Sequence, residues 1–147
     1  MSDYVRSLLS QQQEEALVNA ITKAELSTSG EIRIHLEKST GASSAEQRAK
    51  QWFGKLKMHK TAEKNGVLFY LAIEDRKLAL WAGEGIHQKV PTHFWQEIVD
   101  LMLQEFKVGH FSKGLIAGVE KTGKALGEFF PRKDDDVDEL SNEISKG

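Results

Sequence analysis

The stretch 65–86, NGVLFYLAIEDRKLALWAGEGI, decides the fold. Seven apolar residues, 67–73, run without interruption, which is typical of a central strand covered on both faces. The four charged residues 74–77 are too few for a crossover connection, so the apolar segment 78–82 has to return antiparallel as the second arm of a hairpin. The carboxylates and cations of this turn are either ordinary hairpin chemistry or a functional site.

The residues before the hairpin predict a helix, a strand and a second helix. Ser10 is a typical N-cap, and apolar residues recur behind it at helical spacing. In Glu31–Glu37 apolar and polar residues alternate, which indicates a half-buried strand. The second helix begins with Ser43 or Ser44 as its cap. Strand, helix and strand together predict a βαβ unit with parallel strands and a right-handed crossover.

Two further helices are expected after the hairpin. Pro91 fits the first turn of the third helix, and the fourth helix spans about 111–129 before Pro131 ends it. Gly114 and Gly118 lie on one face of the fourth helix, so this helix can approach its neighbour unusually closely.

Composition limits the class of protein. A chain of 147 residues with 39% hydrophobic and 29% charged residues suits one globular domain. Cysteine is absent, which excludes disulfides, thiolate metal sites and cysteine nucleophiles. The N-terminus has no apolar signal region and no segment approaches the ~18 apolar residues of a membrane span, so we expect a cytoplasmic protein without a membrane partner.

Charge is unevenly distributed along the chain. Residues 132–147 hold six acids and three basic residues, and the net charge of the whole chain is only −2. The remainder is therefore close to neutral, which does not favour nucleic acid as a partner. We expect a domain over residues 1–131, monomeric, followed by an acidic disordered tail over residues 132–147.

Several short motifs carry a resemblance to a known family. They are SGEIRI (29–34), NGVLFYL (65–71), EDRK (74–77), GEGI (83–86) and FSKGLIAGV (111–119). In this order and spacing the chain resembles the TPM domain family over roughly residues 10–130, and is most similar to its short stand-alone cytosolic members. The resemblance implies a three-layer α/β/α sandwich around a small mixed sheet. Family members have been linked to phosphatase activity, divalent-metal binding (calcium especially) and photosystem repair.

One end of the predicted sheet gathers a first set of candidate site residues. The carboxyl ends of the two parallel strands carry Glu37 and the hairpin residues Glu74, Asp75 and Arg76, beside the loop 38–41. Carboxylates and loop carbonyls can supply the six to eight oxygens that calcium prefers. The alternative is a plain turn in which Asp75 accepts local backbone hydrogen bonds and Arg76 is solvated.

The opposite end gathers a second set: Glu31, Gly83, Glu84, Gly85 and His87. Glu31 and Glu84 are candidate metal ligands, and Glu31 is alternatively an edge charge. The GEG turn either presents backbone N–H groups to an anion or uses glycine for positive φ. His87 is either part of this site or a surface histidine.

A departure from the family pattern weakens the second set. His87 and Thr92 stand where many family members have acids, so these two positions lack the carboxylates that the resemblance would offer a metal or phosphate.

Three functions follow from these residues and from the resemblance. The first is a divalent-metal-binding module, with calcium or another divalent cation as its ion. The second is a non-catalytic module that binds a protein partner through its cleft or its tail. The third is a metal-assisted phosphatase in which Arg76 would stabilise developing charge.

Overall fold

The computed structural model describes residues 8–61, 63–132 and 141–147. These residues form a mixed sheet with the strand order β3-β2-β1-β4. The strands are β1 (Glu31–Glu37), β2 (Gly66–Ala72), β3 (Lys77–Ala82) and β4 (Ser145–Lys146). β1 and β2 are parallel and β3 returns antiparallel to β2. The predicted βαβ unit and hairpin are both confirmed.

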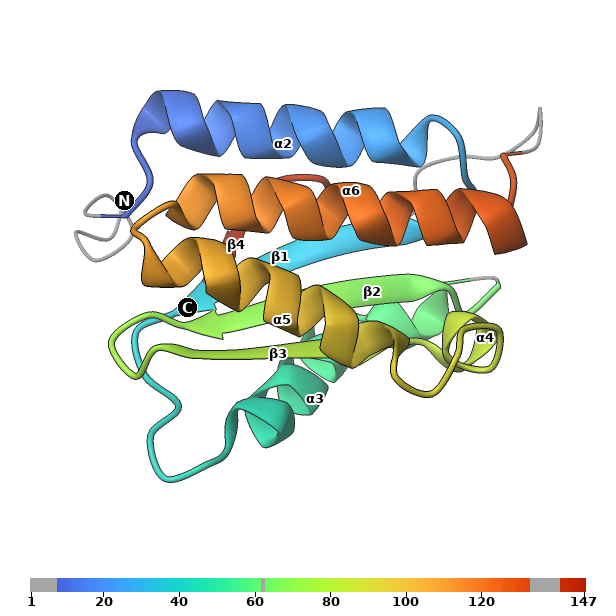
Figure 1. Ribbon diagram of the computed structural model, residues 1–147. Coiled ribbons are helices and arrows are strands. Elements are labelled where there is room, and N and C mark those ends of the chain that lie inside the picture. The colour runs from blue at the N-terminus through green and yellow to red at the C-terminus, as the bar shows by residue number, and fades with distance from the viewer. Residues whose placement is uncertain (1–7, 62, 133–140) are drawn as a thin grey trace.

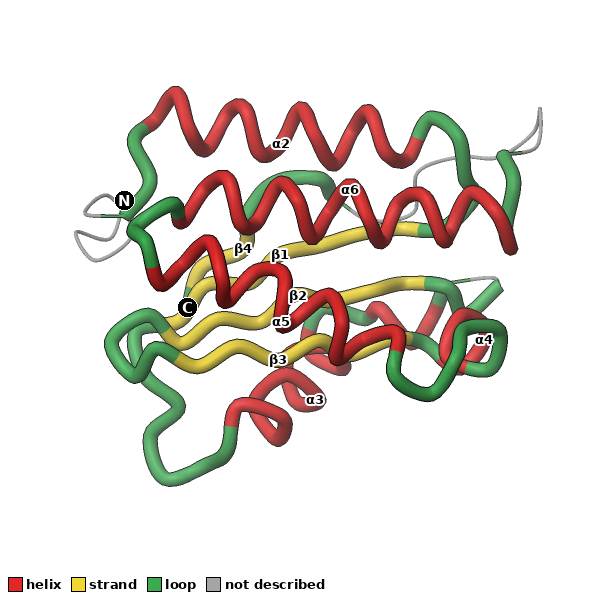
Figure 2. Tube along the Cα trace, in the orientation of Figure 1, coloured by secondary structure: helices red, strands yellow, loops and turns green. Residues whose placement is uncertain are grey.

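Helices cover both faces of the sheet, so the predicted three-layer α/β/α sandwich is confirmed (Figures 1 and 2). One face carries α2 (Gln11–Glu25), α5 (Phe94–Lys107) and α6 (Phe111–Phe129). The other carries α3 (Ala45–Lys55) and the short 3₁₀ turn η1 (Met58–Lys60). A one-turn helix, α4 (Glu84–His87), follows β3.

Local sequence fixes where the first two helices begin. Ser10 caps α2 and Ser44 caps α3, each through a capping box with the glutamine three residues further on. The predicted cap at Ser10 is confirmed, and of the two serines considered for α3 the second is the cap. Pro91 was expected in the first turn of the third helix, but α5 begins at Phe94, whose amide donates to the carbonyl of Pro91.

The main core lies between the sheet and the three-helix face. The alternation along β1 and β2 sends one set of side chains into this core: Ile32, Ile34, Leu36, Val67, Phe69 and Leu71. α6 packs closely against it, as expected from its glycines. A Cβ added at Gly118 would lie 2.6 Å from Met102 Sδ on α5 and 2.9 Å from the ring of Phe69.

The other face of the sheet is also buried, which corrects one expectation. β1 was expected to be half-buried, yet six of its seven residues are buried, because Trp52 and Arg48 of α3 reach over the polar face of the strand and the C-terminal residues pair with its free edge. His35 is 0% exposed and Glu37 is 9% exposed. The alternation in the sequence distinguishes the two faces of the strand but gives no sign that a helix covers the polar one.

The C-terminal residues correct a second expectation. Of the tail expected to be disordered, residues 133–140 lie outside the described residues, whereas residues 141–147 pack on the domain. Ser145 and Lys146 pair in parallel with β1, and Ile144 is 7% exposed. Lys146 Nζ lies 3.0 Å from Glu14 Oε2 on α2. A backbone ladder, one apolar side chain and an ion pair join this end to the domain, together with the side-chain contact between Asn142 and Thr22.

The helices are short or carry many charged residues. Within the described ranges, none combines the length and the apolar character that crossing a bilayer requires.

Candidate functional site

Asp75 ties the hairpin to the loop after β1. Its Oδ2 accepts hydrogen bonds from the backbone N of Thr40 (2.8 Å), from Thr40 Oγ1 (3.1 Å) and from Ser39 Oγ (3.0 Å). The Thr40 amide above all, followed by the two hydroxyls, lowers the pKa of Asp75 below its ordinary value. The two loops that follow the parallel strands therefore meet at an ionised carboxylate.

Glu74 and Arg76 flank Asp75 in the turn. Glu74 is exposed, and its Oε1 lies 3.7 Å from Lys38 Nζ. Arg76 adopts a left-handed conformation with φ 54, which closes the turn. The hairpin turn predicted from EDRK is confirmed. Of the residues predicted for this end, the structure brings Glu74, Asp75 and Arg76 together.

Glu37 belongs instead to a buried cluster beneath α3. Its carboxylate accepts from Arg48 Nε (2.9 Å) and Nη2 (2.6 Å), from Trp52 Nε1 (2.9 Å) and from Tyr70 OH (2.7 Å). Burial alone would raise its pKa, but these hydrogen bonds outweigh burial and lower it to about 2. Burial and the Glu37 bond raise the pKa of Tyr70. Both carboxylate oxygens of Glu37 are therefore committed to protein donors.

His35 completes this cluster. Its ring stacks on Trp52 with centroids 3.7 Å apart, its Nδ1 lies 2.9 Å from Ser145 Oγ, and its Nε2 lies 3.9 Å from Glu37 Oε2. Burial is the main cause that lowers its pKa to about 4, against the opposing charge of Glu37. Because the ring is 0% exposed, the Ser145–His35 pair is not a reachable nucleophile and base.

Sequence reasoning missed this cluster, although two signals were present. His35 and Glu37 are two residues apart on one face of β1, and Arg48 and Trp52 are four residues apart on one face of α3. Pairing these two patterns predicts a polar contact between strand and helix.

The glycines of the GEG turn, at the opposite end of the sheet, are required for a different reason from the one expected. Gly83 has φ −62, and neither Gly83 nor Gly85 adopts positive φ, so that expectation is wrong. A Cβ at Gly83 would lie 2.3 Å from the carbonyl O of Lys64, and one at Gly85 would lie 2.2 Å from that of Glu63. The amides of both glycines donate to backbone carbonyls. The glycines therefore allow two segments to touch, and their amides are not turned to an anion.

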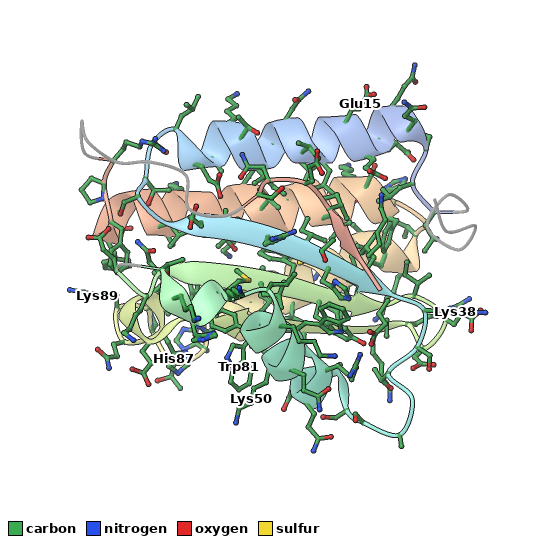
Figure 3. The ribbon with its side chains drawn as sticks, turned by 180° about the vertical axis from the view of Figure 1, so that it is seen from behind. Glu15, Lys38, Lys50, Trp81, His87 and Lys89 are labelled. Carbon is green, nitrogen blue, oxygen red and sulfur yellow. The ribbon has the colours of Figure 1, made fainter. Side chains whose placement is uncertain are left out.

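The remaining candidates at this end do not converge. Glu31 is 2% exposed at the start of β1, whereas Glu84 and His87 lie exposed on α4. Figure 3 shows His87 on the side of the molecule away from α2. Across residues 8–61, 63–132 and 141–147, no three His, Cys, Asp or Glu side chains come together as a metal cluster.

The family comparison covers most of the chain. The family model described as TPM domain matches residues 3–125. A search of curated proteins found no match.

The solved structures that resemble the chain include the following three. The NMR structure of BA42 from the psychrophilic bacterium Bizionia argentinensis is 45% identical, with a TM-score of 0.87 and 95% of both chains covered. The N-terminal domain of a P. gingivalis protein is 26% identical, with a TM-score of 0.68, over 83% of this chain and 79% of that one. The N-terminal domain of cg2496 from Corynebacterium glutamicum shares the fold, with a TM-score of 0.65 at 15% identity, over 82% and 75%.

Proposed function

The chain belongs to the TPM domain family, and on that premise we propose that it is a divalent-cation-binding module with calcium as its ion. The observation that carries the proposal is the position of Asp75. Its carboxylate is ionised and exposed, and it lies where the loops after two parallel strands meet. Open α/β sheets bind ligands at this place.

The residues around Asp75 fit a hard cation. Asp75 and Glu74 supply carboxylate oxygens, and Ser39 and Thr40 supply hydroxyls, all of which are oxygen ligands of the kind calcium takes. The three hydrogen bonds to Asp75 all reach Oδ2, and within the described part of the chain none reaches Oδ1. Oδ1 is therefore the atom we assign to the cation.

The residues around Asp75 also limit the affinity for calcium. Glu37 is bound to Arg48 in the buried cluster and is not available as a ligand. In addition, the cations Lys38, Arg76 and Lys77 lie next to Asp75 and repel a positive ion. With two carboxylates instead of three or four, most of the ligand oxygens would be water. We therefore expect a dissociation constant on the order of 10⁻⁴ to 10⁻³ M, the range of weak calcium modules.

A calcium titration followed by amide chemical shifts tests the proposal. In the wild type we expect saturable shifts in residues 38–41 and 74–77. Asp75→Ala should abolish these shifts, but it also removes the hydrogen bonds that hold the loop 38–41. Glu74→Gln removes one charge and leaves the hydrogen bonds of Asp75 intact, so it should weaken binding without disturbing the loop. Glu84→Gln, an exposed glutamate at the other end of the sheet, is the matched control.

Two outcomes would contradict this assignment. Shifts centred on Glu31 and residues 83–87 would place the cation at the opposite end of the sheet. The absence of any saturable shift at millimolar calcium would show that the chain does not bind calcium as proposed.

A non-catalytic interaction module is the second candidate, and one observation favours it: the hairpin end also carries an open apolar groove. For a metal-assisted phosphatase, the described residues add nothing to the family resemblance.

A further inference from the structure

The groove lies between the β2–β3 hairpin and the junction of α5 with α6, and has a volume of about 820 Å³. Sites for small organic molecules typically have ~300–1,000 Å³ and mostly apolar walls. The groove is therefore large enough to bind such a molecule.

Apolar side chains from both sides line the groove. They are Leu71, Ile73 and Leu78 from the hairpin and Leu103, Phe106 and Phe111 from the helices. Leu71 is buried and forms part of the main core, while the other five are only partly buried. The rings of Phe106 and Phe111 lie 4.9 Å apart, so the helical wall is a continuous aromatic surface. An apolar chain laid along it would remove this surface from water.

Cations flank the apolar lining on both sides. Arg76 and Lys77 belong to the hairpin, and Lys107 ends α5. Within the described part of the chain, no carboxylate lies within ion-pair distance of these three side chains. Glu74 is the acidic residue in the described lining of the groove, and its Oε1 lies 3.7 Å from Lys38 Nζ. None of the three cations is therefore held in an ion pair with a described acid, and the neighbouring Asp75 carboxylate is bonded to the loop 38–41.

We propose that this groove binds a linear amphipathic carboxylate of the fatty-acid class. The alkyl chain would lie along Leu103, Phe106 and Leu78, and the carboxylate would be placed among Arg76, Lys77 and Lys107. Charge complementarity selects the sign of the head group, and the apolar walls select an extended hydrocarbon body. This site does not use Asp75 and does not depend on the proposed cation.

The test uses the full chain with dodecanoate, below its micellar concentration and with EDTA present. The full chain is needed because Leu8 also lines the groove and directly follows residues 1–7, which lie outside the described residues. We expect saturable shifts of the amide signals of Leu78, Leu103 and Phe106 and of the methyl signals of the two leucines. Because EDTA removes free calcium, the result does not depend on the cation proposal.

Charge variants show whether the head group binds as proposed. Lys77→Glu and Lys107→Glu should each weaken dodecanoate binding about tenfold or more, the effect of losing one favourable charge contact of ordinary strength. Lys89→Glu makes the same charge change at an exposed lysine that Figure 3 shows on the opposite side of the molecule from Lys38, and it should leave the affinity unchanged. Leu103→Trp should block the groove and abolish binding.

A second probe separates the proposed head-group contact from simple hydrophobic adsorption. Dodecyltrimethylammonium has the same chain with a cationic head, and we expect it to bind far more weakly than dodecanoate. Equal binding of the two probes would overturn the proposal. No saturable shift with dodecanoate, or an affinity indifferent to both Lys77→Glu and Lys107→Glu, would overturn it as well.

Discussion

Arg48 of α3 holds Glu37 of β1 at two points, with Nε 2.9 Å from Oε1 and Nη2 2.6 Å from Oε2. Such a paired geometry is the strongest that arginine and a carboxylate form. Trp52, one turn further along α3, donates to the same carboxylate. α3 buries only Ala49 and Phe53 fully, so these polar contacts are a large share of what attaches the helix to the sheet.

Removing the guanidinium should destabilise the domain strongly. Arg48→Met keeps an apolar stem but leaves the buried Glu37 charge with fewer donors, which typically costs about 3 kcal/mol or more. Urea unfolding at pH 7 measures the free energy of unfolding. Lys50→Met, an exposed residue on the same helix, is the control and should change it by less than about 1 kcal/mol. Equal losses in both variants would contradict a special role for the Arg48–Glu37 pair.

Acid should destabilise the fold in two steps. The folded-state pKa of His35 is about 4 against an ordinary 6.5, so below pH 6.5 the unfolded chain binds a proton that the folded chain does not. The free energy of unfolding should therefore fall between pH 6.5 and 4, by about 3 kcal/mol in total. Glu37, with a pKa of about 2 against 4.5, should cause a second fall of similar size between pH 4.5 and 2.

A variant without the imidazole isolates the first step. His35→Phe keeps a flat ring against Trp52 and removes the titrating group, so its unfolding free energy should be nearly flat between pH 6.5 and 4.5. Chemical denaturation at several pH values measures both proteins. An unchanged slope in the variant would show that another group is responsible.

Close backbone contact should make Gly83 sensitive to a single methyl group. Gly83→Ala places a Cβ 2.3 Å from the carbonyl O of Lys64, so the backbone has to shift, at a cost of about 1–3 kcal/mol. Gly54 in α3 is the matched control, since nothing lies within 4 Å of its added Cβ. Gly54→Ala should stabilise the helix by about 0.5–1 kcal/mol. Thermal unfolding of the two variants should therefore move in opposite directions.

The C-terminal residues should control the titration of His35. Gly147 lies at the edge of the ring, where an added Cβ would be 2.8 Å from Nε2, and Ser145 contacts Nδ1. Deleting residues 141–147 should therefore expose the imidazole and raise its pKa from about 4 toward 6.5. An NMR titration of the ring protons measures the change. Ser145→Ala keeps the cover and should move the pKa much less; an equal shift in both would assign the effect to the hydroxyl.

Elements with strong periodicity were predictable from the sequence. The seven-residue apolar run 67–73, which follows the turn residues Asn65 and Gly66, favours a buried strand, and the four residues after it are enough only for a hairpin. β4 was not predictable, because a parallel edge strand of two residues is held largely by backbone hydrogen bonds, which leave no apolar pattern.

The candidate site was predictable only in part. Asp75 could be placed at the carboxyl end of the sheet by topology alone. Glu37 is turned away from this site because it binds Arg48. Periodicity predicts the face of the strand on which Glu37 lies, but it does not predict which side chain of another element contacts it. The glycines of GEG show the same limit: Gly83 is required by the carbonyl of Lys64, a contact between segments far apart in the sequence.

The unequal covering of the two faces has a consequence for exchange of amide hydrogens with solvent. Three helices shield one side of the sheet, whereas the eleven-residue α3 and the short turn η1 shield the other. Local opening is easiest where the fewest apolar contacts are lost. The amides of α3 should therefore exchange long before those of α6, in an event that also exposes His35 and Glu37 to water while the main core stays closed.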